Sequence, residues 1–237
     1  MTIFFAELVG TLLLILLGDG VVANVVLKKS GGSGSGLIVI AMGWAFAVGI
    51  PALIFGSYSG AHFNPALTIA LAAIGKVSWA QVPIYLAGQC IGAFLGAVLV
   101  FIVYNDQFKA TDDKASKLGV FCTGPQVKNT TINFISELVG TFVLVYAILG
   151  MGDQKLSNGM GTLFVAFLIL SIGVSLGGPT GYAINPARDL MPRIAHAVLP
   201  IPDKGDSNWG YAWIPVVAPI VGGTLAALFY VMLHGIL

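Results

Sequence analysis

The chain has 237 residues, of which 57% are hydrophobic and only 9% are charged, and its formal net charge is +1. A soluble domain is about one-quarter charged, so these residues cannot cover a water-facing surface. The small net charge also argues against a nucleic-acid partner. Several apolar segments reach the roughly 20 residues that a bilayer span requires. The composition therefore predicts an all-α, multi-pass protein of the cell membrane.

The first half of the chain is predicted to contain three spans and one shorter helix. The spans cover about residues 3–27, 37–55 and 82–104. Between the second and third spans, about ten apolar residues follow Pro65 and end near Lys76. At 1.5 Å per residue such a helix is about 16 Å long, half of a hydrocarbon core of about 30 Å. We therefore expect a half-helix that enters the membrane without crossing it.

The second half repeats this order after a polar segment, residues 105–131, which we predict to be a water-facing loop. Further spans are expected at about residues 132–150, 160–176 and 212–236, with a second half-helix over about 186–198. The sequence ELVGT occurs at residues 7–11 and again at 137–141. We therefore predict a single domain built of two repeats, about 1–104 and 132–237. Because each repeat has an odd number of spans, the second is inverted relative to the first.

The two half-helices begin with the same tripeptide, Asn64-Pro65-Ala66 and Asn185-Pro186-Ala187. Asparagine is a preferred N-cap, and proline suits the first helical turn. In an inverted repeat the positive N-terminal ends of both half-helices meet near the membrane midplane. Non-helical backbone at that depth is tolerated only inside protein or along a wet cavity. We favour the wet path, because two facing positive helix ends need polar contents between them.

Over essentially the whole chain, these features resemble the major intrinsic protein family, the aquaporins and glycerol facilitators. Arg188, which follows the second tripeptide, is itself followed by Asp189. This pair, Arg193 and the Pro215-Val216 pair are similar to the glycerol-facilitator (aquaglyceroporin) branch. The resemblance implies six tilted spans and two half-helices around one pore per protomer, four protomers in a homotetramer, and no cofactor.

The resemblance also implies a selectivity filter formed by Trp44, Gly173, Tyr182 and Arg188. Arg188 would donate hydrogen bonds to a passing hydroxyl or water and repel cations, with Trp44 and Tyr182 as apolar walls opposite. Taken alone, Arg188 could be a snorkelling arginine and Trp44 a core residue. Water-selective relatives place a histidine at the position of Gly173, so we expect the glycine to leave room for a three-carbon solute. The branch usually has phenylalanine where this chain has Tyr182.

The rest of the pore is expected to be lined by backbone carbonyls of Gly60, Ala61, His62, Gly181, Tyr182 and Ala183. Asn64 and Asn185 would each project an amide N–H into the midpoint. A water that accepts from both must point its hydrogens outward, which interrupts a proton relay. The facing helix dipoles add a barrier to cations. No metal site is expected, because His62 has no second ligand at a useful spacing.

Glu7 and Glu137 leave two interpretations open. Carboxylates inside a membrane suggest a functional role such as proton coupling. Their matching positions in the two repeats favour a structural role, in which they accept hydrogen bonds from the N–H groups of the irregular loops. Asp189 is given a similar loop-supporting role, and Asp19 has neither a counterpart nor an assigned role. Glycines at positions 88, 92 and 96 have the spacing typical of close helix packing.

The predicted function is a passive channel for glycerol and other small uncharged solutes, with water flow and exclusion of protons and ions. The alternative is a proton- or ion-coupled secondary transporter, which can share inverted repeats and broken helices. An enzyme is disfavoured, because we find no nucleophile–base pair and no metal cluster. The resemblance places both termini in the cytoplasm. This leaves Lys28, Lys29 and the lysines of residues 105–131 outside, against the positive-inside rule.

Overall fold

A computed structural model of the chain describes residues 1–157 and 159–235, and all regular structure in these residues is helical. Five helices of 21 to 24 residues are long and apolar enough to cross a membrane: α1 (Ile3–Val26), α2 (Leu37–Ser59), α4 (Val82–Val103), α7 (Thr130–Gly152) and α10 (Ile214–His234). The 17-residue apolar helix α8 (Met160–Leu176) is the sixth span and has the predicted bounds. The predicted end of the last span, residue 236, lies outside the described residues.

The two half-helices are α3 (Pro65–Ala73) and α9 (Pro186–Val198), and both begin as predicted. The Asn64 side chain accepts a hydrogen bond from the Ala66 N–H at 2.9 Å, and Asn185 accepts one from the Ala187 N–H at 3.0 Å. Helix α3 ends at Ala73 rather than near Lys76. Gly75 there has a positive φ of 74°, and the Lys76 N–H donates back to the Leu71 carbonyl, which closes the helix.

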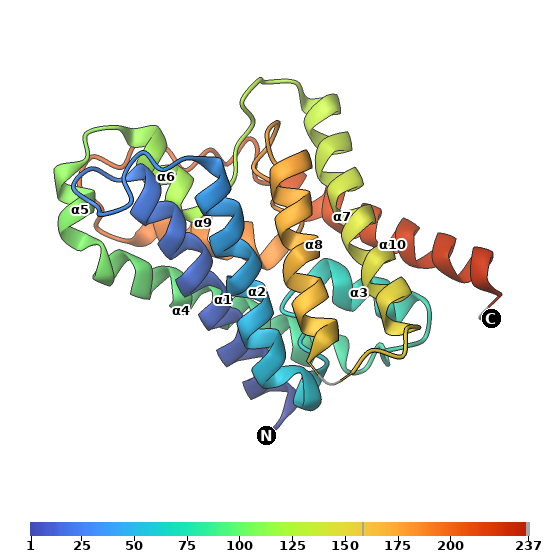
Figure 1. The fold of residues 1–237 in the computed structure, drawn as a ribbon. Helices are drawn as coiled ribbons and strands as arrows, with labels where there is room; N and C mark the ends of the chain where they lie inside the picture. The colour runs from blue at the N-terminus through green and yellow to red at the C-terminus, as the bar shows by residue number, and fades with distance from the viewer. Residues whose placement is uncertain (158, 236–237) are drawn as a thin grey trace.

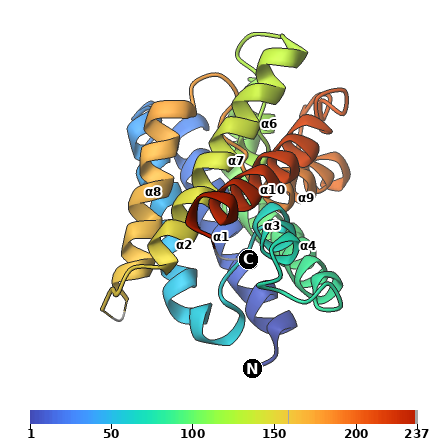
Figure 2. The same cartoon turned by 90° about the vertical axis from the view of Figure 1, so that its right-hand side faces the viewer.

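The two repeats have the same internal packing. Helix α4 lies against α1, and α10 lies against α7, while each half-helix packs mainly on the other repeat, α3 on α10 and α9 on α4. Figure 2 shows α3 beside α10 and α8 beside α2. The predicted close glycine contact is confirmed, because a Cβ added at Gly92 would lie 2.2 Å from the Leu8 carbonyl oxygen. Gly222 of α10 has the same relation to the Leu138 carbonyl of α7.

Residues 105–131 are not the simple water-facing loop that we predicted, because they contain two short helices, α5 (Asn105–Ala110) and α6 (Lys114–Phe121). Phe108 and Phe121 are fully buried, and their rings stack with centroids 5.5 Å apart. Asp113 caps α6 by accepting hydrogen bonds from two backbone N–H groups. The abundance of polar residues concealed the few apolar ones, which fold this segment back onto the membrane domain.

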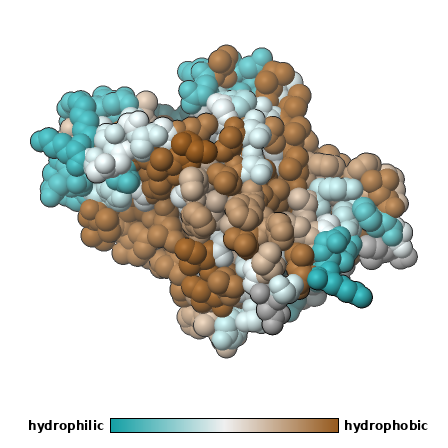
Figure 3. All heavy atoms as spheres, viewed as in Figure 1, coloured by the Kyte–Doolittle hydropathy of each residue, from teal (hydrophilic) through white to brown (hydrophobic). Residues whose placement is uncertain are grey.

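The surface divides into an apolar band and polar ends. In Figure 3, hydrophobic residues cover the middle of the visible face, over α2 and α8, and hydrophilic residues gather over α5 and α6. The apolar band includes exposed large side chains such as Ile50, Leu53 and Phe167. Exposed apolar area of this extent fits hydrocarbon rather than water.

Candidate functional site

The segments that precede the two half-helices have the same unusual backbone. Gly60 and Gly181 have positive φ angles of 80° and 86°. Four non-glycine residues also have positive φ, in equivalent positions of the two repeats: Ala61 (52°), Phe63 (49°), Tyr182 (40°) and Ile184 (45°). Residues other than glycine rarely have a positive φ, because it strains the backbone. This strain persists only where the surrounding structure imposes the conformation. The glycines in the sequence indicated irregular backbone here, but most of the strained positions carry side chains.

Glu7 and Glu137 provide that constraint. Glu7 is fully buried and accepts hydrogen bonds from the backbone N–H groups of His62 (3.0 Å) and Phe63 (2.7 Å). Glu137 accepts from the N–H groups of Ala183 (3.0 Å) and Ile184 (2.9 Å). Each carboxylate thus binds two successive N–H groups directly before a half-helix. Charge-assisted hydrogen bonds of this kind are about twice as strong as neutral ones.

These bonds also orient the loop carbonyls. In a trans peptide the C=O and N–H point in opposite directions, and no cis peptide occurs in the described residues. The carbonyls of Ala61 and His62 therefore point away from Glu7. By the same reasoning, the carbonyls of Tyr182 and Ala183 point away from Glu137. All four residues line one cavity.

The glycine of each ELVGT repeat receives a side chain from the loop. A Cβ added at Gly10 would lie 2.0 Å from the ring of Phe63, and one added at Gly140 would lie 3.0 Å from the Ile184 side chain. The repeated motif therefore holds each loop twice, by the glutamate on the backbone and by the glycine under the following side chain. The repeat was visible in the sequence, but the partner of the glycine was not.

The two asparagines join the repeats at the centre of the fold. The Asn64 amide donates to the Ile184 carbonyl at 2.8 Å, and the Asn185 amide donates to the Phe63 carbonyl at 2.7 Å. Each side-chain oxygen meanwhile caps its own half-helix. An amide nitrogen carries two N–H groups, so one on each asparagine remains beyond these bonds. Both residues line the cavity.

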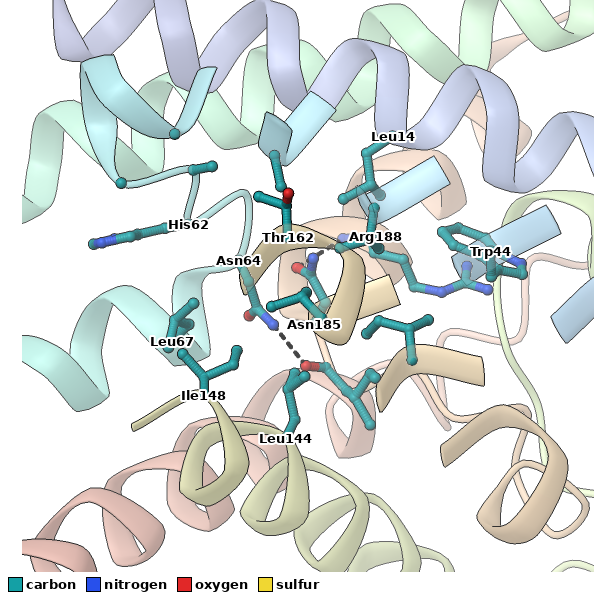
Figure 4. Close-up of a pocket in the computed structure, with 18 of the residues that line it drawn as sticks. Leu14, Trp44, His62, Asn64, Leu67, Leu144, Ile148, Thr162, Asn185 and Arg188 are labelled. Atoms are coloured by element: carbon teal, nitrogen blue, oxygen red, sulfur yellow. Dashed lines mark hydrogen bonds between the residues drawn. The ribbon is translucent and has the colours of Figure 1, made fainter. Parts of the chain in front are cut away.

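A cavity of about 290 Å³ runs past these groups. Figure 4 shows His62 at one end, Asn64 and Asn185 in the middle, and Arg188 with Trp44 at the other end. Apolar side chains from several spans complete the wall, among them Leu14, Val48, Leu67, Leu144, Ile148, Val165 and Ile169. The lining thus combines residues of the two irregular loops, the two asparagines and Arg188 with apolar side chains of the spans.

At the Arg188 end, the geometry differs from the expectation. The Arg188 guanidinium carbon lies 3.9 Å from the centre of the Trp44 ring, so the two side chains stack rather than face each other across the cavity. Tyr182 also lines this end. Asp19, to which the sequence assigned no role, is fully buried, with its Oδ1 3.6 Å from Nη1 of Arg188.

Gly173 and Gly181 are not among the residues that line the cavity, although the sequence placed both along the pore. A Cβ added at Gly173 would lie 2.9 Å from Cζ of Tyr182 and 3.0 Å from its hydroxyl oxygen. The space beside this glycine is therefore filled by the Tyr182 ring. The remaining carbonyl residues, Gly60, Ala61, His62, Tyr182 and Ala183, do line the cavity.

A second buried network supports the start of α9. Asp189 accepts hydrogen bonds from the Thr123 N–H (2.7 Å) and hydroxyl (2.6 Å), and it pairs with Arg193 at 2.7 Å. Arg193 is fully buried and also donates to the carbonyls of Ser207 and Thr123. Sequence reasoning missed Thr123 and the structural task of Arg193. The spacing of Asp189 and Arg193, four residues apart on one helix, was the available signal.

Residues 1–230 match the family described as Major intrinsic protein, and the chain belongs to that family. The family consists of membrane channels. Six spans and two half-helices in inverted repeats, as predicted from the sequence, are its fold.

The chain is 56% identical, over 97% of its length, to the probable glycerol uptake facilitator protein of Thermotoga maritima, and covers 98% of that protein. It is also 56% identical to the glycerol uptake facilitator protein of Bacillus subtilis, over 97% of this chain and 84% of that one. The crystal structure of the aquaglyceroporin from Plasmodium falciparum superposes with a TM-score of 0.86 at 32% identity, and covers 96% of this chain and 93% of that one.

Proposed function

We propose that the chain forms a passive channel that conducts glycerol and other small uncharged solutes, together with water. The observation that carries this proposal is the cavity itself, which is lined by residues of both irregular loops, by two asparagines and an arginine, and by many apolar side chains. The names of the bacterial relatives, glycerol uptake facilitators, support glycerol as the solute.

The two kinds of wall suit a polyol. Hydroxyl groups on one edge of glycerol can donate to the carbonyls of Ala61, His62, Tyr182 and Ala183, and can accept from Arg188. The CH groups on the other edge can pass along the apolar wall. The filter of the proposed channel is the cavity end formed by Trp44, Tyr182 and Arg188, with Gly173 behind the Tyr182 ring. A solute that leaves these buried polar groups unpaired is rejected.

Exclusion of ions and protons follows from the centre of the cavity. The N-termini of α3 and α9 present positive dipole ends there, which oppose a cation. The remaining N–H groups of Asn64 and Asn185 can each donate to one water oxygen. The hydrogens of that water then point outward, and the hydrogen-bonded file that could relay protons is interrupted.

A proton-coupled transporter is the alternative, with Glu7 and Glu137 as the coupling groups. Their hydrogen bonds favour a structural role. Besides the two loop N–H groups, Glu7 accepts from the Ser59 hydroxyl at 2.5 Å and from the Gln89 amide at 2.8 Å. Four donors stabilise a carboxylate in its charged form, and neither glutamate is among the residues that line the cavity.

The assembly and the orientation are proposed on the family resemblance. Four protomers form a homotetramer in the cell membrane, each with its own pore, and both termini lie in the cytoplasm. The exposed apolar faces of α2 and α8 are available to lipid or to a neighbouring protomer.

Swelling of proteoliposomes tests the proposed channel. Glycerol influx should rise linearly with its gradient and should not respond to a pH gradient, while urea and longer polyols rank the solutes. Protein-free liposomes provide the baseline. Uphill accumulation of glycerol driven by protons would falsify the channel and favour the transporter.

A further inference from the structure

Asp19 is a buried carboxylate in α1 that stands outside the machinery described so far. Its side chain is fully buried, and neither of its oxygens receives a hydrogen bond from the described residues. Burying a charged group without a partner is costly, so such groups are paired or specifically retained. Asp19 has one close cation, because its Oδ1 lies 3.6 Å from Nη1 of Arg188.

The backbone around Asp19 also supports the Arg188 end of the cavity. A Cβ added at Gly18 would lie 2.3 Å from the Trp44 ring, so this ring rests directly on α1 beside Asp19. The Arg188 guanidinium stacks on the same ring at 3.9 Å. One turn of α1 therefore contacts both Trp44, through Gly18, and Arg188, through Asp19.

The neighbouring charges leave Asp19 as the counter-ion of Arg188. Asp189 is paired with Arg193 at 2.7 Å, and both side chains are completely buried. Asp189 is further occupied by the two Thr123 donors. With Asp19 ionised, the charges of Asp19, Arg188, Asp189 and Arg193 sum to zero. Without it, Arg188 has no carboxylate partner, because Asp189 pairs with Arg193.

The inverted repeat shows that the fold does not need charges at this location. Glu7 corresponds to Glu137, so Asp19 corresponds to Leu149. Asn185 corresponds to Asn64, so Arg188 corresponds to Leu67. Leu67 and Leu149 are both buried and belong to one apolar cluster. Each pair joins one residue of each repeat: Leu67 and Leu149 form an apolar contact site, whereas the equivalent positions at the proposed filter hold the ion pair Asp19–Arg188.

We propose that Asp19 is a positioning residue of the filter, which holds the Arg188 guanidinium against Trp44 and thereby keeps the passage beside it open to polyols. The inference rests on the proposed channel function. Asp19 does not line the cavity and acts only through Arg188. Once the attraction is removed, the guanidinium is free to leave the ring and turn into the cavity, where it obstructs glycerol more than the smaller water molecule.

The test compares Asp19→Asn with the wild type in proteoliposomes, with water and glycerol permeabilities measured on the same vesicles. The ratio of glycerol to water permeability should fall by about twofold or more, as expected when a single occupied orientation becomes one of two. Asp106→Asn, which changes an exposed carboxylate, serves as the control and should leave the ratio unchanged. The ratio does not depend on the amount of folded protein, because a loss of folded protein lowers both permeabilities alike. An unchanged ratio in Asp19→Asn therefore overturns the proposal.

Stability provides a second measurement that does not depend on flux. Arg188→Leu leaves Asp19 buried without its cation and should lower the thermal denaturation midpoint. Adding Asp19→Leu reproduces the leucine pair of the other repeat and should restore the midpoint, because an apolar pair can replace a buried ion pair. A double variant no more stable than Arg188→Leu overturns the pairing. If the wild type itself carries no glycerol, the proposed function fails, and the stability comparison still decides on the pair.

Discussion

Among single residues, Tyr182 lines the cavity although its hydroxyl group is buried. The hydroxyl oxygen has no hydrogen-bond partner among the described residues. A buried polar group without a partner costs about 1–3 kcal/mol. The hydroxyl therefore points into the protein next to Gly173 rather than into the passage.

Tyr182→Phe should accordingly leave the selectivity between polyols nearly unchanged, because it removes an atom that does not face the solute. The free energy of unfolding should rise by about 1 kcal/mol as the unpaired hydroxyl is lost. Stopped-flow light scattering with glycerol and longer polyols, together with thermal denaturation, measures both effects. A clear change in the ratio between polyols would place the hydroxyl in the passage and contradict this geometry.

Gly173→Ala should impair glycerol permeation although position 173 does not line the cavity. The added Cβ would overlap the Tyr182 ring at 2.9 Å, and we expect the ring to shift toward the cavity that Tyr182 lines. Glycerol permeability should fall more than water permeability, and Gly173→His should increase the difference. Gly178→Ala is the matched control, because its Cβ would meet nothing within 4 Å. Equal losses of water and glycerol would mean that the ring does not control the passage.

At the scale of elements, the half-helices depend on the two glutamates that hold their preceding loops. Glu137→Gln replaces one acceptor by an N–H₂ group that faces the N–H of Ala183 or Ile184. The loss should be about 1.5–3 kcal/mol, the value of a hydrogen bond to a charged group. Yield and denaturation midpoint should fall, while the solute selectivity of the remaining folded protein stays the same. A stable variant with abolished flux would instead favour coupling chemistry at this residue.

The helix pair α1–α4 depends on glycine at the point of closest approach. Gly92→Ala would place a methyl group 2.2 Å from the Leu8 carbonyl oxygen and push the helices apart, at a cost of about 1–3 kcal/mol. Gly20→Ala in α1 is the control, because its Cβ would meet nothing within 4 Å and alanine favours a helix. Thermal denaturation in detergent should separate the two variants. Similar midpoints would show that the pair can relax around the methyl group.

At the scale of the whole molecule, the contacts between loops define which segments share a side of the membrane. Lys28 and Asp112 form an ion pair of 2.7 Å, so the loop after α1 and the α5–α6 segment lie on the same side. With termini in the cytoplasm, both are external.

In a background without the two native cysteines, Ser33→Cys and Lys109→Cys should react with a membrane-impermeant thiol reagent on intact cells. Lys155→Cys should react only after lysis, and the opposite pattern would reverse the orientation.

Several features of this protein follow from its sequence alone, because they are local. A run of apolar residues determines a span, and an Asn-Pro pair determines a helix start, so the spans and half-helices were predicted within a few residues. The error at residues 105–131 arose where a few buried phenylalanines lay among many polar residues. The recurrence of ELVGT indicated two repeats. The odd number of spans in each repeat then predicted that the second is inverted relative to the first.

Only the tertiary structure decided which distant side chains meet. The family resemblance implied Trp44 opposite Arg188, but the guanidinium stacks on the ring, and Asp19, separated from Arg188 by most of the chain, lies beside it. The contact between Gly173 and the Tyr182 ring likewise could not be read from the sequence. The physical reason is that these contacts depend on how helices of different repeats approach one another. That approach is determined by packing across the whole domain, and no local pattern of residues records it.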